Sequence, residues 1–274
     1  MDKIRLSYAP LNNAGDLFNK DLVEKLSGKE VVNSKVYNAD MIAIGGALIG
    51  AQYSKSFKRK LCQKALSVVY GNKPLYVWGS GFFKNDNDSG LYRRNLKVCA
   101  LRGRKTLEKL SHLTGKKYDV PLADAGLLAD MFVSKGISKQ YEIGLIPHMS
   151  QLEDESMKKL LSMDNVKLID IRRPAKDVID DIASCECILS SSLHGLIFAD
   201  SLHIPSMHIW GDKELYGGNF KFEDYYSSFG VEDTPYVVGE ADLPTKKMIF
   251  DSYKIPSDMV EEKKHQLVES FPKL

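Results

Sequence analysis

Short apolar runs alternate with amphipathic segments along most of this chain. In the first half, the runs that predict strands lie at residues 4–9, 40–46, 74–81 and 96–103. The segment after the first run repeats its apolar residues with a helical period, and its stripe consists of Leu17, Phe18, Leu22, Val23 and Leu26. We expect a helix there, with Asp16 as its cap and Gly28 at its end.

The pattern starts again in the second half of the chain. Strands are predicted at residues 142–148, 166–171, 186–191 and 205–210, and helices at 175–185 and 193–203. Strands that alternate with helices indicate βαβ units and parallel sheets. We therefore interpret the chain as an α/β protein with two Rossmann-like lobes, residues 1–137 and 138–255, and a C-terminal helix within 256–274. One continuous domain is the alternative, because the second lobe is small.

Composition and charge narrow the class of protein. The 274 residues are 43% hydrophobic and 27% charged, which is typical of a globular protein. Lys and Arg number 38 against 36 Asp and Glu, so the formal net charge is +2 and no nucleic-acid partner is expected. No apolar run is long enough to cross a membrane, and the N-terminus lacks the apolar region of a signal peptide. We expect a cytoplasmic protein.

The cysteines predict no metal site. Their spacing, at Cys62, Cys99, Cys185 and Cys187, matches no zinc motif. We expect buried thiols at Cys185 and Cys187, and no disulfides.

Polar residues and glycines follow nearly every predicted strand. They are Asn12, Asn13, Gly15, Asp16, Gly45, Gly46, Gly79, Ser80, Gly81, Arg102, Gly103, Arg104, His148, Arg172, Arg173, Ser190, Ser191, Ser192, Leu193 and His194. Ligands of open parallel sheets bind beyond the carboxyl ends of the strands, so these residues mark a cleft. Glycines let a ligand approach the backbone, and hydroxyls with free helix N–H groups favour an anion. The set predicts a site for a small phosphorylated or carboxylated molecule.

Several of these features have simpler explanations. The segment 12–16 could form only a turn and a cap, and the pair at 45–46 only a tight exit from a strand. The run 79–81 is half of a dinucleotide-binding fingerprint, which is weak evidence on its own. His148 could equally be a structural residue.

Two features are harder to explain structurally. Arg102 follows an apolar run and precedes a helix, so its guanidinium should face the cleft. Arg104 and Lys105 put two cations at the start of that helix, which is unfavourable against the helix dipole unless an anion lies there. His194 follows three serines in the sequence LSSSLHG, and a nearby anion would raise its pKa and keep it a proton donor near neutrality.

These motifs together resemble those of the polysaccharide pyruvyltransferases. The segments that carry the resemblance are NNAGDLFN, ADMIAIGGALIG, CALRGRKTLEKL, GLIPH and ILSSSLHGLIFADSLHIPSM. In addition, NFKFEDYYSSFG is similar to a lysine-containing segment of the subgroup that makes acidic exopolysaccharides. The segments occur in the expected order between about residues 8 and 230, and their order and spacing carry the resemblance.

The resemblance implies a two-lobed architecture like that of the GT-B glycosyltransferases, with the site between the lobes. It implies phosphoenolpyruvate as donor, whose pyruvyl group becomes a ketal bridging two sugar hydroxyls. Arg102, Ser192 and His194 would lie in the donor site, with His148 and Lys221 as further candidates. Many members carry arginine where this chain has Ser192. Here the donor's charge would be held by Arg102, Arg104 and Lys221, together with the backbone and hydroxyls of Ser190, Ser191, Ser192 and Leu193.

The donor's chemistry suggests roles for these residues. In our hypothesis His194 is the general acid that protonates the methylene carbon, and Arg102 and Lys221 clamp the donor. Asp16 and His148 are candidates for the base. The residues expected on the acceptor side or elsewhere in the cleft are Asn13, Gly15, Asp16, Gly45, Gly46, Gly79 and Ser80. This chemistry requires no metal and no cofactor besides phosphoenolpyruvate as co-substrate.

Two other functions compete with this one. A GT-B glycosyltransferase that uses a nucleotide sugar would need a similar cleft, and also an acidic residue for the ribose, a role for which Glu186 and Asp200 are poorly placed. A non-catalytic carbohydrate-binding protein would tolerate changes at His194 and Arg102. The acceptor could be a sugar or a lipid-linked oligosaccharide. In the second case the basic segment 56–64 could touch the inner face of an anionic membrane, although a solvated helix face is the simpler expectation. The sequence leaves the oligomeric state open.

Overall fold

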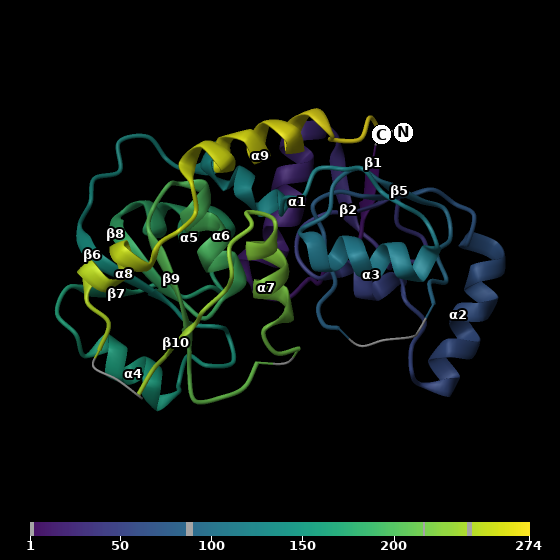
Figure 1. The fold of residues 1–274 in the computed structure, drawn as a ribbon. Coiled ribbons are helices and arrows are strands. Elements are labelled where there is room, and N and C mark those ends of the chain that lie inside the picture. The colour runs from purple at the N-terminus through teal and green to yellow at the C-terminus, as the bar shows by residue number, and fades with distance from the viewer. Residues whose placement is uncertain (1–2, 86–89, 216, 240–242) are drawn as a thin grey trace.

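The strands of the protein form two parallel sheets that lie side by side (Figure 1). The computed structural model describes residues 3–85, 90–215, 217–239 and 243–274. The first sheet has the order β2-β1-β3-β4-β5, with strands Lys3–Leu6 (β1), Glu30–Asn33 (β2), Met41–Ile42 (β3), Leu75–Val77 (β4) and Leu96–Val98 (β5). The second has the order β10-β9-β8-β6-β7, with strands Tyr141–Ile146 (β6), Val166–Leu168 (β7), Cys185–Ser190 (β8), Ser206–Trp210 (β9) and Tyr236–Val237 (β10). The predicted two-lobed α/β fold is confirmed, and it is consistent with a Rossmann-like, GT-B-like arrangement.

The two sheets repeat one topology. In each, the first strand along the chain lies between the second and the third, and the fourth and fifth follow outward from the third. The strand order therefore reverses between β1 and β3, where Leu6 pairs with Met41, and between β6 and β8, where Ile146 pairs with Ser190. Ligands of doubly wound sheets bind at such reversal points, beyond the carboxyl ends of the strands.

Helices pack around both sheets (Figure 1). Those of the first half are Ala14–Ser27 (α1), Phe57–Tyr70 (α2) and Arg104–Thr114 (α3), with 3₁₀ segments Ala47–Ala51 (η1) and Ala125–Phe132 (η2). Those of the second half are Glu155–Leu161 (α4), Ala175–Ala183 (α5), Leu193–Ser201 (α6), Phe220–Ser227 (α7), Lys246–Ser252 (α8) and Ser257–Glu269 (α9). No helix within the described ranges is long and apolar enough to cross a membrane.

The start of α1 corrects one prediction. The cap is Asn13 and not Asp16, because the Asn13 side-chain oxygen accepts hydrogen bonds from the backbone N–H groups of Gly15 and Asp16. Asp16 lies in the first turn, and Gly28 ends the helix in the left-handed conformation as expected. Residues 125–132 form the 3₁₀ segment η2.

The sequence pattern missed the short elements β2, α4, α7, β10 and α8. Each has at most eight residues, too few for an apolar period to stand out. The expected burial of Cys185 and Cys187 is confirmed.

Apolar contacts join the two halves of the molecule. Phe18 of α1 meets Phe198 of α6 edge to face across the two halves, with ring centroids 5.3 Å apart, and meets Phe132 of η2 in its own half at 5.0 Å. The backbone N–H of Ala14 donates to the carbonyl of Ile171 at 2.7 Å, which ties the start of α1 to the second sheet's lobe. The helix α1 thus follows the first strand of the first sheet but packs against helices of the second half.

The predicted terminal helix is present as α9 and runs along the top of both halves (Figure 1). Its Lys264 ammonium donates to the carbonyl of Ser201 in the second half, at 2.8 Å. Near its end, the carbonyl of Leu267 accepts from the indole N–H of Trp78 in the first half, at 2.9 Å. The helix α9 therefore fastens the halves together on one side.

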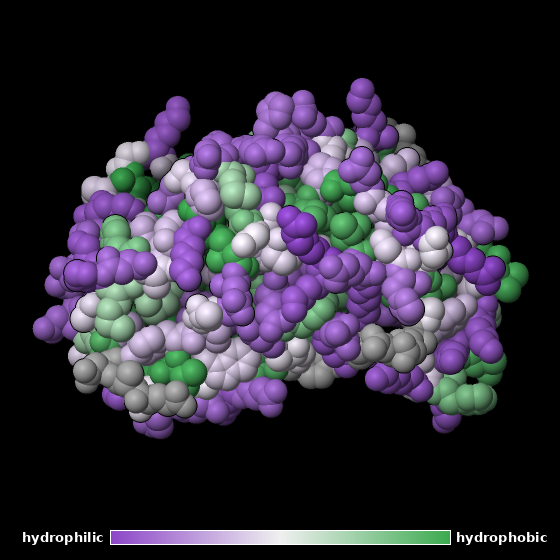
Figure 2. All heavy atoms as spheres, viewed as in Figure 1, coloured by the Kyte–Doolittle hydropathy of each residue, from purple (hydrophilic) through white to green (hydrophobic). Residues whose placement is uncertain are grey.

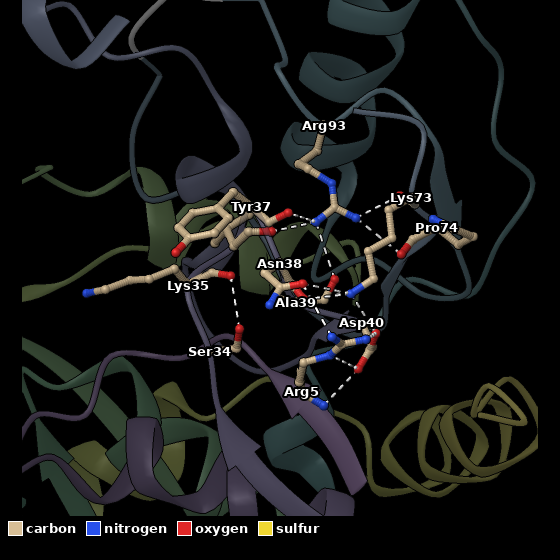
Figure 3. A network of polar contacts seen from close by, with 11 residues as sticks. Arg5, Ser34, Lys35, Tyr37, Asn38, Ala39, Asp40, Lys73, Pro74 and Arg93 are labelled. Carbon is tan, nitrogen blue, oxygen red and sulfur yellow. Dashed lines mark hydrogen bonds and ion pairs between the residues drawn. The ribbon is translucent and has the colours of Figure 1, made fainter. Parts of the chain in front are cut away.

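A polar network closes the amino ends of the strands in the first sheet (Figure 3). The fully buried guanidinium of Arg93 donates to the carbonyls of Val36, Tyr37 and Ala39 before β3 and of Lys73 and Pro74 before β4. Beside it, Arg5 makes a two-pronged ion pair with Asp40. This network leaves the carboxyl ends of the strands available to form a binding site.

We expect Arg93→Met to lower the free energy of unfolding by about 3 kcal/mol or more, because it leaves several buried carbonyls without a donor. Denaturant unfolding monitored by circular dichroism measures this. The matched control is Arg94→Met, since Arg94 is exposed and its guanidinium bonds Ser67; a change within about 1 kcal/mol is expected there. Equal losses in the two variants would contradict the assigned role.

Candidate active site

A cavity of about 510 Å³ lies where the reversal points of the two sheets face each other. The loops after β1 and β3 form one wall, and the loops after β6 and β8 form the opposite wall. Predicted site residues line it from both sides: Asn13, Asp16, Gly45, Gly46, Arg102, His148, Ser192, Leu193, His194 and Lys221. The structure thus brings together residues that are more than 200 positions apart in the sequence.

Charged and titratable groups gather at one end of this cavity. Burial raises the pKa of Asp16 to about 6, although Lys221 nearby opposes the shift. Burial, with Arg102 beside it, lowers the pKa of the Lys221 ammonium to about 8. The pKa of His148 is lowered to about 4 by burial and by Lys221. Several shifted pKa values in one cavity are characteristic of catalytic sites.

The His194 ring is held between two glycines. A Cβ added at Gly15 would lie 2.0 Å from the ring's Cγ and Nδ1, and one at Gly45 would lie 3.5 Å from Cε1. Burial, followed by the charges of Lys221 and Arg102, lowers the pKa of His194 to about 3. Its Nε2 is buried without a hydrogen-bond partner among the described residues. With these neighbours alone the ring is neutral at pH 7, so a proton-donating role requires an anion beside it.

Arg102 reaches the cavity but is already engaged on one side. Its Nε donates to the Oδ2 of Asp224 at 2.8 Å, and its Nη2 donates to the carbonyl of Phe82. Both side chains of the ion pair are almost fully buried. The Arg102 Nη1 makes no hydrogen bond with a described residue, which leaves one edge of the guanidinium for a ligand.

Asp224 also supplies the negative charge that was expected beside Arg104 and Lys105 at the start of α3. Its carboxylate accepts from the backbone N–H of Thr106 at 2.8 Å and from the Thr106 hydroxyl at 2.7 Å. The anion expected at this helix start is therefore a carboxylate of α7 and not a ligand. Arg104 is exposed, donates to the Ser227 carbonyl, and does not line the cavity.

The three serines of LSSSLHG differ in whether they line the cavity. The Ser190 hydroxyl donates to the carbonyl of Ile146 and accepts from the N–H of Ser192, and the Ser191 hydroxyl accepts from the N–H of His148. These two hydroxyls hold the loops after β6 and β8 together and do not line the cavity. Ser192 lines the cavity, and its hydroxyl makes no hydrogen bond with a described residue.

Gly79 and Ser80 also lie behind the cavity wall. A Cβ at Gly79 would come within 2.6 Å of the backbone nitrogen of Ala125, and the Ser80 hydroxyl donates to the carbonyl of Gly45 at 2.9 Å. The neighbouring Gly81 leaves room for the guanidinium of Arg102, 2.6 Å from where its Cβ would stand. The run 79–81 therefore serves packing in this structure.

Lys221 enters the cavity from α7, the same helix that carries Asp224. Its Nζ lies 5.4 Å from the ring centroid of Phe83 and 5.0 Å from that of Phe222, so its stem is packed among aromatic rings. Because Asp224 fixes this helix against α3, the ion pair with Arg102 also positions Lys221.

Neither Asp224 nor Asp124 was among the predicted site residues. Asp124 is fully buried next to Arg102, its Oδ1 accepts from the N–H of Gly126, and burial raises its pKa to about 6. A charged residue three positions after Lys221 was a weak signal for Asp224, since α7 itself was not predicted.

Much of the remaining lining of the cavity is apolar. This part of the lining includes Tyr8, Leu11, Ile49, Phe83 and Met149. Within the described part of the chain, no group of three or more His, Cys, Asp or Glu side chains could hold a metal ion. The cavity thus combines charged groups that suit an anion with apolar lining that suits a second molecule.

Comparison with known proteins identifies the family. The family model "Polysaccharide pyruvyl transferase" matches residues 2–213, more than three quarters of the chain. The chain belongs to this family. It is similar to the uncharacterized protein L143 of Acanthamoeba polyphaga mimivirus, with 31% identity over 238 residues, 82% of this chain and 73% of that protein. It is also similar to the succinoglycan biosynthesis protein ExoV of Rhizobium meliloti (strain 1021), with 27% identity over 160 residues, 58% of this chain and 49% of that protein.

Membership in the polysaccharide pyruvyl transferase family confirms the resemblance found in the sequence, and the likeness to ExoV supports the acidic-exopolysaccharide subgroup. Membership in this family makes the chain a transferase that acts in polysaccharide biosynthesis. The matched range contains Arg102, His148 and His194 but ends before Lys221 and Asp224. Those two residues are tied to the cavity by the structure.

We expect Gly15→Ala to reduce pyruvyl transfer by roughly 100-fold, because the new methyl group would displace the His194 ring. The fold should survive, since alanine favours a helix over glycine. Steady-state rates, together with the NMR signals of the His194 ring, measure both effects. Gly90→Ala is the control, because an added Cβ there meets no atom within 4 Å. Wild-type rates in Gly15→Ala would show that the ring's position is unimportant.

Proposed function

We propose that this protein transfers the pyruvyl group of phosphoenolpyruvate to a sugar of a polysaccharide precursor, where it forms a ketal across two hydroxyls. The observation that carries the proposal is the convergence of Arg102, Lys221 and His194 at one end of a cavity between the lobes. Phosphoenolpyruvate carries a carboxylate and a phosphate, and this end of the cavity supplies two cations for them.

The donor's charge would be held by groups that make no hydrogen bond with a described residue. These are the Nη1 of Arg102, the Nζ of Lys221 and the hydroxyl of Ser192. The backbone N–H groups at the start of α6 add a favourable dipole for an anion. Since many members have arginine in place of Ser192, Lys221 supplies the second cation here.

His194 fits the role of general acid once the donor is bound. In the protein alone, burial and two nearby cations keep its pKa at about 3. A bound anion would offset those cations and favour the protonated ring. The ring would then protonate the methylene carbon and leave a cationic carbon at C2.

The remaining steps need a base for the sugar hydroxyls. One hydroxyl adds to C2, the C–O bond to phosphate breaks, and the second hydroxyl closes the ketal. Of the two hydroxyl protons, one balances the proton used at the methylene carbon and the other leaves with the phosphate. Asp16 is the better candidate base, because its pKa of about 6 is closer to neutrality than that of His148, about 4.

The apolar part of the cavity lining would hold the acceptor. Tyr8 and Phe83 offer ring faces against which a sugar can pack, next to the charged end. Among the predicted cleft residues, Asn13, Gly45 and Gly46 line the same space.

The two carboxylates weighed for the ribose of a nucleotide sugar, Glu186 and Asp200, are both engaged outside the cavity. Asp200 is buried and accepts hydrogen bonds from the hydroxyls of Tyr225 and Tyr253, so it cannot bind a ribose. Glu186 pairs with Lys246, and neither carboxylate lines the cavity. These contacts favour a compact anionic donor over a nucleotide sugar.

The test is to incubate the protein with phosphoenolpyruvate and a panel of sugar acceptors, and to follow phosphate release and product mass. We expect acceptor-dependent release with a pyruvyl mass gain, reduced by roughly 10² to 10⁴ in His194→Gln. His265→Gln is the control, because His265 lies on the exposed side of α9. Turnover that survives His194→Gln would assign the acid elsewhere. Binding of a nucleotide sugar without binding of phosphoenolpyruvate would refute the proposed donor.

A further inference from the structure

The helix α2 carries an apolar stripe that no described part of the protein covers. Phe57, Leu61 and Val68 are 81%, 59% and 86% exposed, and their spacing of four and seven residues puts them on one face. Figure 2 shows hydrophobic side chains, in green, at the end of the molecule where Figure 1 places α2. A stripe of this kind on a single helix marks an interaction surface.

The opposite face of α2 attaches the helix to the first lobe. The Gln63 side chain accepts from the N–H of Ser54 and donates to the carbonyl of Gln52. Tyr70 packs against Tyr37, with ring centroids 5.4 Å apart. These contacts fix the orientation of the helix, so that the stripe points outward.

Lysines flank the exposed stripe. By helical spacing, Lys58 lies on one side of it, and Lys60 and Lys64 lie on the other. The helix contains no acidic residue, and these lysines make no ion pair within the described ranges. An apolar stripe bordered by cations is the pattern of helices that lie in the interface of an anionic membrane.

A second hollow connects this helix to the candidate active site. It measures about 620 Å³ and is lined by Arg59, Gln63 and Leu66 of α2. It shares Tyr8 and Val36 with the active-site cavity, so the two hollows adjoin along that wall.

We propose that α2 docks the protein on the surface of a bilayer that contains anionic lipid, with Phe57, Leu61 and Val68 inserted among the lipids and the lysines at the headgroups. The docking proposal depends on the features of α2 alone and not on the proposed function. Its consequence for catalysis rests on the proposed function: the hollow behind α2 adjoins the cavity, so docking would bring the cavity close to the bilayer and suit an acceptor carried on a lipid.

A second copy of the chain is the alternative partner that could cover the stripe. Charge argues against it, because two such helices packed along their stripes would bring the flanking lysines of both copies together without an acidic partner on either helix. An anionic surface neutralises the same lysines.

The experiment measures co-sedimentation of the full chain with vesicles of phosphatidylcholine that contain phosphatidylglycerol, and with vesicles of phosphatidylcholine alone. We expect binding to the anionic vesicles that weakens with added salt. The variant Lys58→Gln/Lys60→Gln/Lys64→Gln should lose roughly 100-fold in affinity. The variant Phe57→Ser/Leu61→Ser/Val68→Ser should lose binding as well. In the matched controls, Lys116→Gln/Lys117→Gln and Met248→Ser/Phe250→Ser change exposed side chains elsewhere and should bind as wild type.

Binding that is equal on the two kinds of vesicle, or unchanged in both α2 variants, would overturn the proposal. So would a dimer, found by analytical ultracentrifugation, that the Phe57→Ser/Leu61→Ser/Val68→Ser variant dissociates while vesicles do not bind. Circular dichroism establishes that the variants are folded. Vesicle binding does not depend on pyruvyl transfer, so this result and the turnover result can fail separately.

Discussion

The buried ion pair between Arg102 and Asp224 is the contact on which the geometry of the site depends. It joins residues 122 positions apart, and both side chains are almost fully withdrawn from water. Further hydrogen bonds to the two charged groups offset the cost of burying such a pair. Here Thr106 donates twice to the carboxylate, and the carbonyl of Phe82 accepts from the guanidinium. The same carboxylate caps α3, so one side chain aligns α7, α3 and the arginine.

The position of the cavity follows from the repeated topology. Both sheets reverse their strand order between the first and the third strand along the chain, and the two reversal points face each other. One sheet supplies loops with Asn13, Asp16 and two glycines, and the other supplies His148 and the start of α6. The helices α1 and α9 bridge the halves on other sides. Two similar units thereby supply the groups that line one cavity.

Much of this arrangement could be predicted from the sequence, because it rests on local patterns. Apolar runs and helical periods predicted the parallel sheets, and the rule on strand ends selected most of the cavity's polar residues. What could not be predicted depends on long-range contacts. Nothing near Asp224 in the sequence shows that it pairs with Arg102, and without that pair Arg104 looked like a ligand residue. In the same way, Ser190 and Ser191 looked like anion ligands, although their hydroxyls serve the adjoining backbone.

The central claim is that the cations at the charged end of the cavity hold the donor, and the pH dependence of phosphoenolpyruvate binding tests it most directly. Burial places the pKa of Lys221 at about 8, so the free protein loses this charge above that pH. Titration calorimetry between pH 7 and 10 should therefore show affinity that declines above pH 8, by up to about tenfold per pH unit. In Lys221→Arg the charge persists, and the decline should disappear. Wild-type affinity that stays constant from pH 7 to 10 would contradict the account.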